Sequence, residues 1–248
     1  MKEEIDHSNL PRHIAVIMDG NGRWAKKKGA MRLFGHKNAI TAVREVTEGC
    51  AELGIEYLTL YAFSTENWGR PKDEVSGLMN LLVLIIKNEI DKLMKNNVRL
   101  QMIGNMNDLP KFCQAELQEA IKATQYNTGL TLTLALNYSG RQEISEAVRS
   151  LVQDGLDGKI RPEEICPELI GQYLLTKDMP DPELLIRTSG EMRISNFLLW
   201  QIAYTELYMT DLLWPDFRRE HLHQAITTFQ KRERRFGKIS EQLKIKVK

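Results

Sequence analysis

Short apolar runs alternate along the chain with longer segments of helical periodicity. The apolar runs, some of them partly β-branched, predict six strands over residues 14–18, 57–63, 98–103, 130–136, 182–186 and 206–209. Apolar residues spaced three or four apart predict helices over residues 37–53, 71–95, 109–126, 142–153, 162–175 and 217–236. Basic or glycine-bearing loops are expected over 26–32 and 154–158.

This alternation predicts one α/β domain with a central, mostly parallel six-stranded sheet flanked by helices on both faces. The sequence shows no internal repeat and no low-complexity linker. We therefore expect a single domain over residues 1–248, with flexible tails at 1–9 and 238–248.

The helix predicted over 71–95 is more apolar than a surface helix requires. Eight of the nine residues from Leu78 to Ile86 are apolar, so this part is hydrophobic on all sides. The helix can pack in the core or at a subunit interface, or one face can line an apolar cavity for a lipid chain. The pattern alone leaves these alternatives open.

The first predicted strand ends in residues suited to binding an anion and a metal. Asp19 follows the strand directly, and Gly20, Asn21, Gly22 and Arg23 come next. Glycines let backbone N–H groups approach an anion closely, and a carboxylate suits Mg²⁺, which often bridges to substrate phosphates. In an open parallel sheet, ligands bind beyond the carboxyl ends of the strands. We infer a magnesium–diphosphate site here; the simpler alternative is a strand followed by a polar turn.

Polar clusters also follow the second, fourth and fifth strands, so they should gather at the same edge of the sheet. The cluster after the fifth strand contains Arg187, Arg193 and Ser195, which form a plausible cradle for a second diphosphate or an exposed ion-pairing surface. Arg32 and Arg70 can join either cradle.

His36 directly precedes a predicted helix and lies close to the expected anion site. It can simply cap that helix. In its cationic form, it can instead stabilise a diphosphate that leaves during the reaction.

Composition excludes several other classes of protein. The 34 basic and 33 acidic residues leave a net charge of +1, which gives no global field toward nucleic acid or an anionic membrane. Three cysteines, far apart in sequence, predict buried thiols in a reducing compartment. The charged N-terminus has no signal-peptide segment, and no apolar stretch is long enough to span a bilayer. We expect a soluble, cytoplasmic protein that binds no nucleic acid.

Familiar catalytic motifs are absent. The glycine loop matches neither G-x-x-x-x-G-K-[ST] nor G-x-G-x-x-G, so a nucleotide is not implied. The sequence has no Ser-His-Asp pattern, no nucleophile elbow, no H-E-x-x-H and no D-D-x-x-D cluster of the trans-type isoprenoid synthases. A single aspartate, two basic cradles and a long apolar helix need another explanation.

The motifs themselves offer an explanation for this combination of features. The stretch from His13 to Ala25, HIAVIMDGNGRWA, resembles the signature of cis-prenyltransferases, specifically the bacterial undecaprenyl diphosphate synthases. The resemblance continues in order, with familiar spacing, from about residue 10 to residue 237. It is carried by residues 35–36, 58–68, 70–71, 187–191, 193–201, 206–208 and 213–217.

The resemblance implies an activity, a cofactor and partners. Such enzymes condense an allylic diphosphate, usually farnesyl diphosphate, with successive isopentenyl diphosphates to form Z double bonds. The implied product is a long-chain polyprenyl diphosphate, undecaprenyl diphosphate, the precursor of the lipid carrier for cell-wall synthesis. A homodimer and a transient membrane-surface contact for product release are also implied.

The resemblance also assigns roles to residues. Mg²⁺ would be held by Asp19, with Glu206 as a second contact. Asn67 corresponds to the proton acceptor of the family; because an amide is a poor base, we expect it to orient the substrate while diphosphate removes the proton. The allylic substrate would be held by Gly20, Asn21, Gly22, Arg23, Trp24, Arg32 and His36. Isopentenyl diphosphate would be held by Arg187, Arg193, Ile194 and Ser195, with Ser64, Thr65, Glu66, Trp68 and Arg70.

Two other functions compete with this prediction. The chain can be a catalytically silent partner subunit, although such proteins typically lose the aspartate or the first-loop glycines that are present here. It can also be a different α/β enzyme, such as a phosphatase that uses Asp19 as a nucleophile. Chain elongation rather than phosphate release would separate these possibilities.

Overall fold

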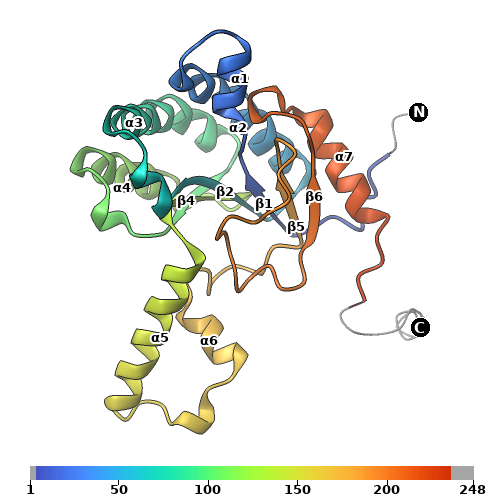
Figure 1. Ribbon diagram of the computed structural model, residues 1–248. Helices are drawn as coiled ribbons and strands as arrows, with labels where there is room; N and C mark the ends of the chain where they lie inside the picture. The colour runs from blue at the N-terminus through green and yellow to red at the C-terminus, as the bar shows by residue number, and fades with distance from the viewer. Residues whose placement is uncertain (1–3, 236–248) are drawn as a thin grey trace.

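A computed structural model describes residues 4–235 of the chain (Figure 1). Six strands form one sheet in the order β3-β4-β2-β1-β5-β6, and every neighbouring pair is parallel. The predicted α/β fold is confirmed, and the sheet is parallel throughout. The strands are β1 (His13–Ile17), β2 (Tyr57–Ser64), β3 (Arg99–Ile103), β4 (Thr131–Tyr138), β5 (Leu184–Arg187) and β6 (Glu206–Met209).

The helices follow the sequence pattern with three corrections. The segment predicted as a loop from residue 26 belongs to a helix as far as Lys27. The glycine-bearing segment after residue 153 continues a helix to Leu156. The last described helix ends at Gln230 rather than at 236. The helices are α1 (Asn21–Lys27), α2 (Arg32–Leu53), α3 (Lys72–Lys95), α4 (Lys111–Thr124), α5 (Gly140–Leu156), α6 (Pro167–Tyr173) and α7 (Arg219–Gln230).

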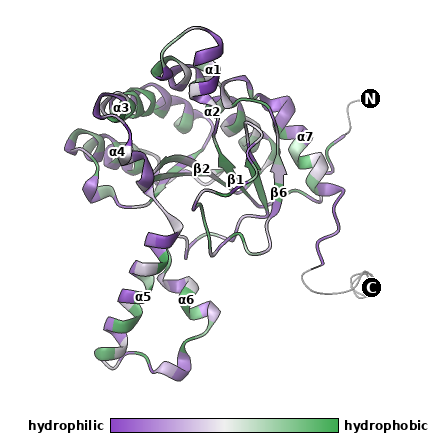
Figure 2. Ribbon diagram, in the orientation of Figure 1, coloured by the Kyte–Doolittle hydropathy of each residue, from purple (hydrophilic) through white to green (hydrophobic). Residues whose placement is uncertain are grey.

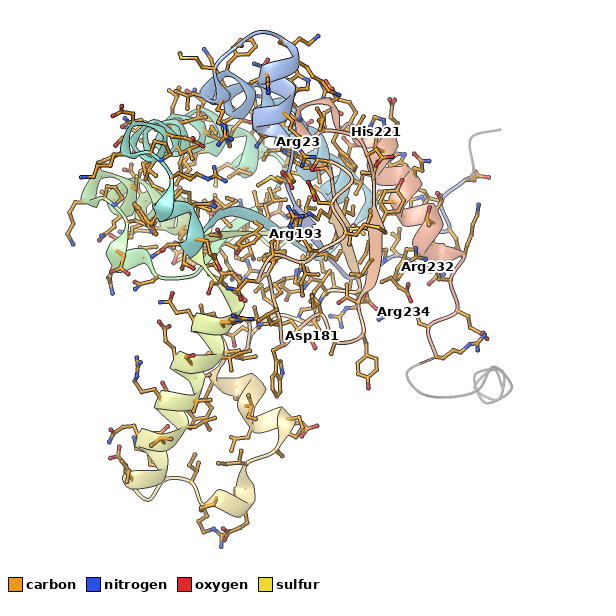
Figure 3. The ribbon with its side chains drawn as sticks, viewed as in Figure 1. Arg23, Asp181, Arg193, His221, Arg232 and Arg234 are labelled. Atoms are coloured by element: carbon orange, nitrogen blue, oxygen red, sulfur yellow. The ribbon has the colours of Figure 1, made fainter. Side chains whose placement is uncertain are left out.

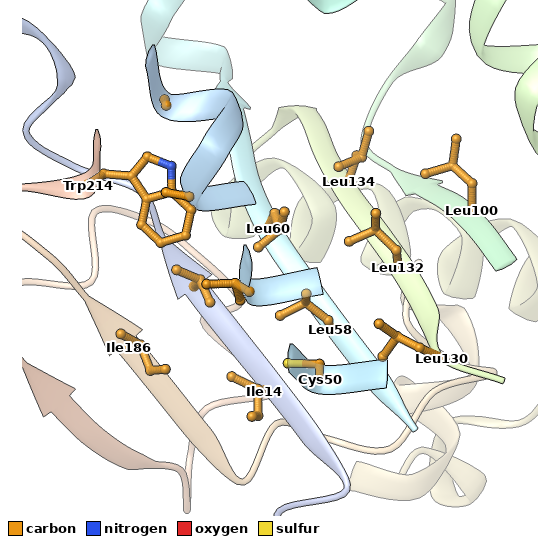
Figure 4. Packing of buried hydrophobic residues seen from close by; sticks show 14 of the residues in the cluster. Ile14, Cys50, Leu58, Leu60, Leu100, Leu130, Leu132, Leu134, Ile186 and Trp214 are labelled. Carbon is orange, nitrogen blue, oxygen red and sulfur yellow. The ribbon is translucent and has the colours of Figure 1, made fainter. Parts of the chain in front are cut away.

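One face of the sheet is covered by helices. Alternate strand residues such as Ile14, Leu58 and Leu60 pack against α2, α3, α4 and α7, and the buried thiol of Cys50 and the indole of Trp214 complete this core (Figure 4). Apolar side chains every second strand residue are what a buried sheet face requires.

The other face is covered differently from the prediction. Ala15, Ile17 and Leu185 pack against Phe197 and Leu198, which belong to the irregular segment between β5 and β6. No helix contributes to the described core of this face. The segment that carries much of the second predicted diphosphate cradle therefore lies directly on the sheet.

The three cysteines differ in their exposure. Cys50 and Cys113 are buried, as predicted, whereas Cys166 is exposed. Cys166 directly precedes α6, a short helix outside both sheet cores, which leaves its thiol uncovered.

An arm formed by α5 and α6 projects from the body of the molecule (Figure 1). Its base is fixed by the buried carboxylate of Glu143, which accepts hydrogen bonds from the Tyr138 hydroxyl at 2.6 Å, the Gln201 amide at 3.0 Å and the Leu175 backbone N–H at 3.0 Å. A buried carboxylate that lost these donors would be costly, so this network holds the arm in position.

His13 makes the stability of the fold dependent on pH. Its ring is buried at the start of β1, where Nδ1 donates to the Pro180 carbonyl at 2.7 Å and Nε2 accepts from the Thr59 hydroxyl at 2.8 Å. Burial lowers the pKa of His13 to about 4, from 6.5. Because the folded-state pKa is the lower one, this contribution to stability is complete above pH 6.5 and is lost as the pH falls through 4.

We therefore expect the His13→Asn variant to lose less stability than the wild type between pH 6.5 and 4. The difference should approach about 3 kcal/mol, since each pKa unit corresponds to about 1.4 kcal/mol. Urea unfolding at several pH values measures it, and His7→Asn, at an exposed position, is the control. Parallel pH profiles for wild type and His13→Asn would contradict the expectation.

Candidate active site

Polar side chains meet at the carboxyl ends of three neighbouring strands. Ile17 at the end of β1 is paired with Tyr61 of β2 and with Arg187 at the end of β5. The loops that follow β1, β2 and β5 consequently leave the sheet side by side. They open into one cavity of about 440 Å³. The polar residues lining it are Asp19, Asn21, His36, Ser64, Asn67, Arg70, Arg187, Arg193 and Ser195.

Asp19 lies at the centre of this polar group. Its Oδ2 accepts a hydrogen bond from Arg187 Nη2 at 2.9 Å and lies 3.5 Å from Arg23 Nη2, while Oδ1 accepts from the Gly20 backbone N–H at 2.6 Å. Burial acts to raise the pKa of Asp19, but the hydrogen bond and charge of Arg187 outweigh it and lower the pKa. The carboxylate is therefore ionised at neutral pH.

Arg187 connects the two expected cradles. Its side chain is only 3% exposed, and Nη1 donates to the Ser195 hydroxyl at 2.8 Å and to the Arg193 carbonyl. The same guanidinium therefore binds Asp19 on one side and the loop after β5 on the other. A buried, fully charged fork in this position fixes the geometry between the two sides.

Close backbone contacts shape the glycine loop. Gly20 has φ 103°, and a Cβ there would lie 2.8 Å from the Leu213 side chain. Gly35 of α2 packs so closely that a Cβ would lie 2.0 Å from the Asn21 carbonyl oxygen. The first helical hydrogen bond of α1 joins the Trp24 N–H to the Gly20 carbonyl, so the preceding N–H groups have no helical acceptor.

A second cavity of about 200 Å³ adjoins the first at this loop. Arg32 and Arg70 both face Glu74 of α3, with N–O distances of 3.5 and 3.2 Å. Arg23 donates to the Ser189 hydroxyl at 2.5 Å and pairs with Glu191 at 3.1 Å. The arginines around the two cavities outnumber the carboxylates, so the combined site favours an anion. The lining residues are Met18, Asp19, Gly20, Asn21, Gly22, Arg23, Arg32, His36, Arg70 and Glu74.

His36 lies within α2 rather than before it, and its ring is neutral in the protein without a bound anion. A cationic ring beside a leaving diphosphate stays a prediction. Burial lowers the pKa of His36 to about 4, and the charges of Arg70 and Arg32 act in the same direction against the opposing effect of Glu74. Nδ1 lies 3.3 Å from the Asn21 side-chain nitrogen, which suits an accepting Nδ1 and a proton on Nε2. Neither burial nor the two arginines can be inferred from the position of His36 in the sequence.

The inner part of the main cavity is apolar and lies between α2 and α3. Ala39, Ile40 and Val43 line it from α2, opposite Leu82 and Ile85 of α3. Leu84, two residues after Leu82 and one before Ile85, is 49% exposed and lies outside the lining. The helix thus contributes to both the core and the cavity: Met79 and Ile86 are buried in the core, and they also line the cavity. That this cavity receives a lipid chain stays a prediction.

The segment after β5 has an unusual backbone. Ser189, Ser195, Asn196 and Leu198 all have positive φ, between 46° and 76°. Asn196 donates from its side chain to Glu66 at 2.7 Å and accepts from a backbone N–H of α5. These contacts compensate for the backbone strain and tie the loop after β5 to the loop after β2.

Several predicted site residues lie outside the described lining of both cavities. Trp24 donates from its indole to Asp216 at 2.8 Å, and Trp68 donates to Asn137 at 2.7 Å. Glu66 supports Asn196, as described above. In this structure, Trp24, Trp68 and Glu66 hold neighbouring segments in position. The predicted residues outside the lining are Trp24, Thr65, Glu66, Trp68, Ile194 and Glu206.

Glu206 lies far from Asp19 within one chain. It begins β6, where it is in register with Leu184 at the start of β5, whereas Asp19 follows the other end of the sheet. Its carboxylate pairs with Arg232 at 2.8 Å. Figure 3 shows Arg232 well separated from Arg23 and Arg193. Within one chain, Glu206 and Asp19 therefore do not share a metal ion.

Residues that were not predicted from the sequence also hold the site together. Thr188 donates from its hydroxyl to the Asp19 carbonyl at 2.7 Å and accepts from the Asp19 N–H at 2.9 Å, and Glu74 bridges two arginines. The positions of Thr188 and Glu74 in the sequence do not predict these contacts. The cavity-lining residues of α2 could have been found, because Ala39, Ile40 and Val43 form one apolar face of a predicted helix.

The donors at the site fit a hard cation bound together with phosphate oxygens. In the described part of the chain, no three His, Cys, Asp or Glu side chains are grouped to hold a metal by themselves. Asp19 supplies one carboxylate, and the buried Oδ1 of Asn21 has no hydrogen-bond partner among the described residues. Mg²⁺ is commonly held by one or two carboxylates plus substrate phosphates, so one aspartate suffices.

Comparison with known proteins identifies the family. A family model described as putative undecaprenyl diphosphate synthase matches residues 17–237. The chain belongs to this prenyltransferase family. It is 54% identical to the isoprenyl transferase of Chlorobaculum tepidum, over 95% of this chain and 89% of that protein. It is 51% identical to the ditrans,polycis-undecaprenyl-diphosphate synthase, (2E,6E)-farnesyl-diphosphate specific, of Pasteurella multocida, over 96% and 99% of the two chains.

Solved structures of the prenyltransferase family confirm the fold. Lavandulyl diphosphate synthase from Lavandula x intermedia, in complex with dimethylallyl diphosphate, has a TM-score of 0.91 and 34% identity, covering 93% of this chain and all of that one. A probable undecaprenyl diphosphate synthase from Campylobacter jejuni has a TM-score of 0.77 and 33% identity, with the same coverage. None of the helices described for this chain is long and apolar enough to cross a membrane.

Proposed function

We propose that this prenyltransferase condenses isopentenyl diphosphate repeatedly onto farnesyl diphosphate to form a long-chain Z-polyprenyl diphosphate, undecaprenyl diphosphate. The observation that carries the proposal is the continuity of one cavity, in which an arginine-rich mouth around Asp19 leads directly into an apolar tunnel between α2 and α3. An allylic diphosphate has the same two parts, a charged head and an apolar tail. The name of the Pasteurella multocida relative supports farnesyl diphosphate as the primer.

The two cradles divide the substrates. The cavity around the glycine loop suits the allylic diphosphate, because it opens into the tunnel that would receive the tail. The loop after β5, with Arg193 and Ser195, suits isopentenyl diphosphate. Arg187 lies between the two and would keep their reacting ends at a fixed separation.

The first chemical step breaks the bond between C1 of the allylic substrate and its diphosphate oxygen, and the electron pair leaves with the diphosphate. Arg23, Arg32 and Arg70 would neutralise the charge that develops on this leaving group. Neutral His36 would donate a hydrogen bond from Nε2. Asp19 would hold Mg²⁺, which would supply Lewis-acid stabilisation of the same charge. The apolar tunnel excludes water from the allylic carbon.

In the second step, C4 of isopentenyl diphosphate bonds to C1 through the electrons of its double bond, which leaves a positive charge on C3. Loss of a proton from C2 of the same isopentenyl unit then forms the new double bond. Asn67 lines the cavity, and its Oδ1 accepts a hydrogen bond from the Ser64 N–H at 3.2 Å. That bond leaves the Asn67 NH₂ group free to orient a substrate oxygen. An amide is too weak a base to accept the proton, so we assign the role of proton acceptor to a diphosphate oxygen.

Product analysis tests the function directly. Incubation of the protein with farnesyl diphosphate, labelled isopentenyl diphosphate and Mg²⁺ should give long Z-polyprenyl diphosphates by thin-layer chromatography and mass spectrometry. A phosphatase would release phosphate without elongation, and a silent partner subunit would do neither. A single condensation would indicate a short-chain synthase instead.

Arg193→Ala should raise KM for isopentenyl diphosphate about 10- to 100-fold and leave KM for farnesyl diphosphate nearly unchanged, because one charge-assisted hydrogen bond contributes about 1.5–3 kcal/mol. Steady-state kinetics with each substrate varied in turn measure the effect. Arg235→Ala is a matched control. Both arginines are exposed, at 62% and 59%, and each pairs with a glutamate two residues earlier. Equal losses for both substrates would show that the cradles are wrongly divided.

We also propose that the enzyme is a homodimer formed through the α5–α6 arm. Val148, Val152 and Leu156 are spaced four residues apart on α5 and are all at least half exposed, and Ile165 and Leu175 add to the apolar surface of the arm (Figure 2). Sedimentation should show a dimer that dissociates in the Val152→Asp variant. The exposed Tyr126 lies elsewhere, and Tyr126→Asp should leave the dimer intact.

A homodimer also offers the one arrangement in which Glu206 could serve a magnesium site. Because Glu206 and Asp19 lie at opposite ends of the sheet in one chain, such a contact would come from a second copy. Mixing Glu206→Ala chains with Asp19→Asn chains tests this. If Glu206 acts across the interface, mixed dimers regain activity that both parent variants lack, whereas no recovery would reject the assignment of Glu206.

A further inference from the structure

A basic and apolar loop lies at the end of the molecule opposite the α5–α6 arm (Figure 1). We define it as residues 26–34, which include the last turn of α1 and the first turn of α2. Lys26, Lys27 and Lys28 are exposed, and so are Leu33 and Phe34. Met31 is 83% exposed, among the highest values for a large apolar side chain in the described residues.

The surroundings of this loop carry charge of one sign. From Gly20 to Val43 the chain has six lysines and arginines and no aspartate or glutamate. Among the described residues, no carboxylate lies within 4 Å of the ammonium groups of Lys26 or Lys27. The ammonium of Lys28 lies 5.8 Å from the centre of the Trp24 ring. These cations are therefore available to an external anion.

The other large apolar surface differs in charge. Residues 141–168 of the arm contain four basic and seven acidic residues. An anionic surface would repel the arm and attract the loop at 26–34. The arm and the loop at 26–34 consequently suit different partners, and the partner that suits the loop is anionic.

The loop also adjoins the diphosphate cradle. Lys26 and Met31 line a groove of about 470 Å³ together with Gly22, Arg23 and Arg32, three residues that line the cradle as well. A surface bound by the loop would lie next to the opening through which a diphosphate head leaves.

We propose that residues 26–34 dock the protein on an anionic phospholipid bilayer. Met31 inserts among the acyl chains, and Lys26, Lys27 and Lys28 contact lipid phosphates. Exposed apolar side chains combined with a cationic cluster are the two contributions that together give stable but reversible membrane binding. The consequence for catalysis rests on the proposed function: a water-insoluble product would be released beside the membrane.

Vesicle flotation of the full-length protein tests the proposal. We expect binding to phosphatidylcholine vesicles that contain phosphatidylglycerol, and little binding to phosphatidylcholine alone. The double variant Lys26→Gln/Lys27→Gln should bind about 30-fold more weakly, and Met31→Ser about tenfold more weakly. Matched controls at exposed positions elsewhere, Lys95→Gln/Lys111→Gln and Tyr126→Ser, should bind like the wild type.

Elongation assays in detergent, without vesicles, separate this proposal from the proposed function. The loop variants should elongate normally there. Vesicle binding that is independent of phosphatidylglycerol, or that the loop variants leave unchanged, would overturn the membrane proposal. So would a raised KM for farnesyl diphosphate in these variants without vesicle binding, because the loop would then be part of the substrate site. Loop-dependent vesicle binding by a chain that fails to elongate would support docking and reject the proposed function.

Discussion

Asp19→Asn is expected to lower the rate of elongation on the order of 10³-fold while leaving the fold intact. Loss of one well-placed group that stabilises developing charge typically costs 10²–10³-fold, and Asp19 is the only carboxylate among the described residues that line the main cavity. Arg187 and the Gly20 N–H donate to different oxygens of Asp19, and the asparagine keeps one of these oxygens. With that oxygen turned toward Arg187, the buried guanidinium retains its partner and only the hydrogen bond from the Gly20 N–H is lost. The measurement is the elongation rate as a function of Mg²⁺ concentration.

Comparison with Asp19→Ala separates charge from structure. The alanine variant should be equally inactive but less stable, because it leaves Arg187, which is 3% exposed, with one partner fewer. Arg187 keeps its bonds to Ser195 and the Arg193 carbonyl, and Asp19 is itself 30% exposed, so the loss should be modest. Near wild-type, Mg²⁺-dependent elongation by Asp19→Asn would refute the metal assignment.

The sheet could be predicted because its strands are buried on both faces. All five residues of β1 are buried, so Ile14 and Val16 face one core while Ala15 and Ile17 face the other, and the apolar run is continuous. The helix α1 could not be predicted in this way. Only Ala25 of its seven residues is buried, so the helix has no apolar periodicity to detect.

The clustering of the site could be predicted from parallel topology, because residues that follow parallel strands meet at one edge. The same topology places Glu206 away from that edge. The sequence predicts that Glu206 begins the sixth strand, and the register with β5 confirms it, so Glu206 lies at the opposite edge of the sheet from the residues that follow the strands. The charge of His36 was beyond prediction, since its pKa depends on burial and on arginines that other elements supply.

The second large effect is expected from substitutions in the apolar tunnel between α2 and α3. Leu82→Trp or Ile85→Trp should shorten the polyprenyl product while largely preserving the first condensation, because both side chains line the cavity beyond its polar mouth. Ala62→Leu should act similarly, since Ala62 lines the same cavity from β2. Product sizing by mass spectrometry measures the change. Leu84→Trp is the matched control on the same helix, with its side chain 49% exposed and outside the lining.

The two roles of α3 can be separated in these variants. If Leu82 and Ile85 matter only for packing, an added indole would cost about 1–3 kcal/mol of stability and leave product length unchanged. If they limit the space for the growing chain, the product shortens even where the melting temperature is hardly altered, because the indole occupies volume that is empty in the free enzyme. Normal-length product from destabilised Leu82→Trp and Ile85→Trp proteins would therefore assign the helix to the core alone. Shortened product from these two but not from Leu84→Trp would assign the inner face of α3 to the polyprenyl chain.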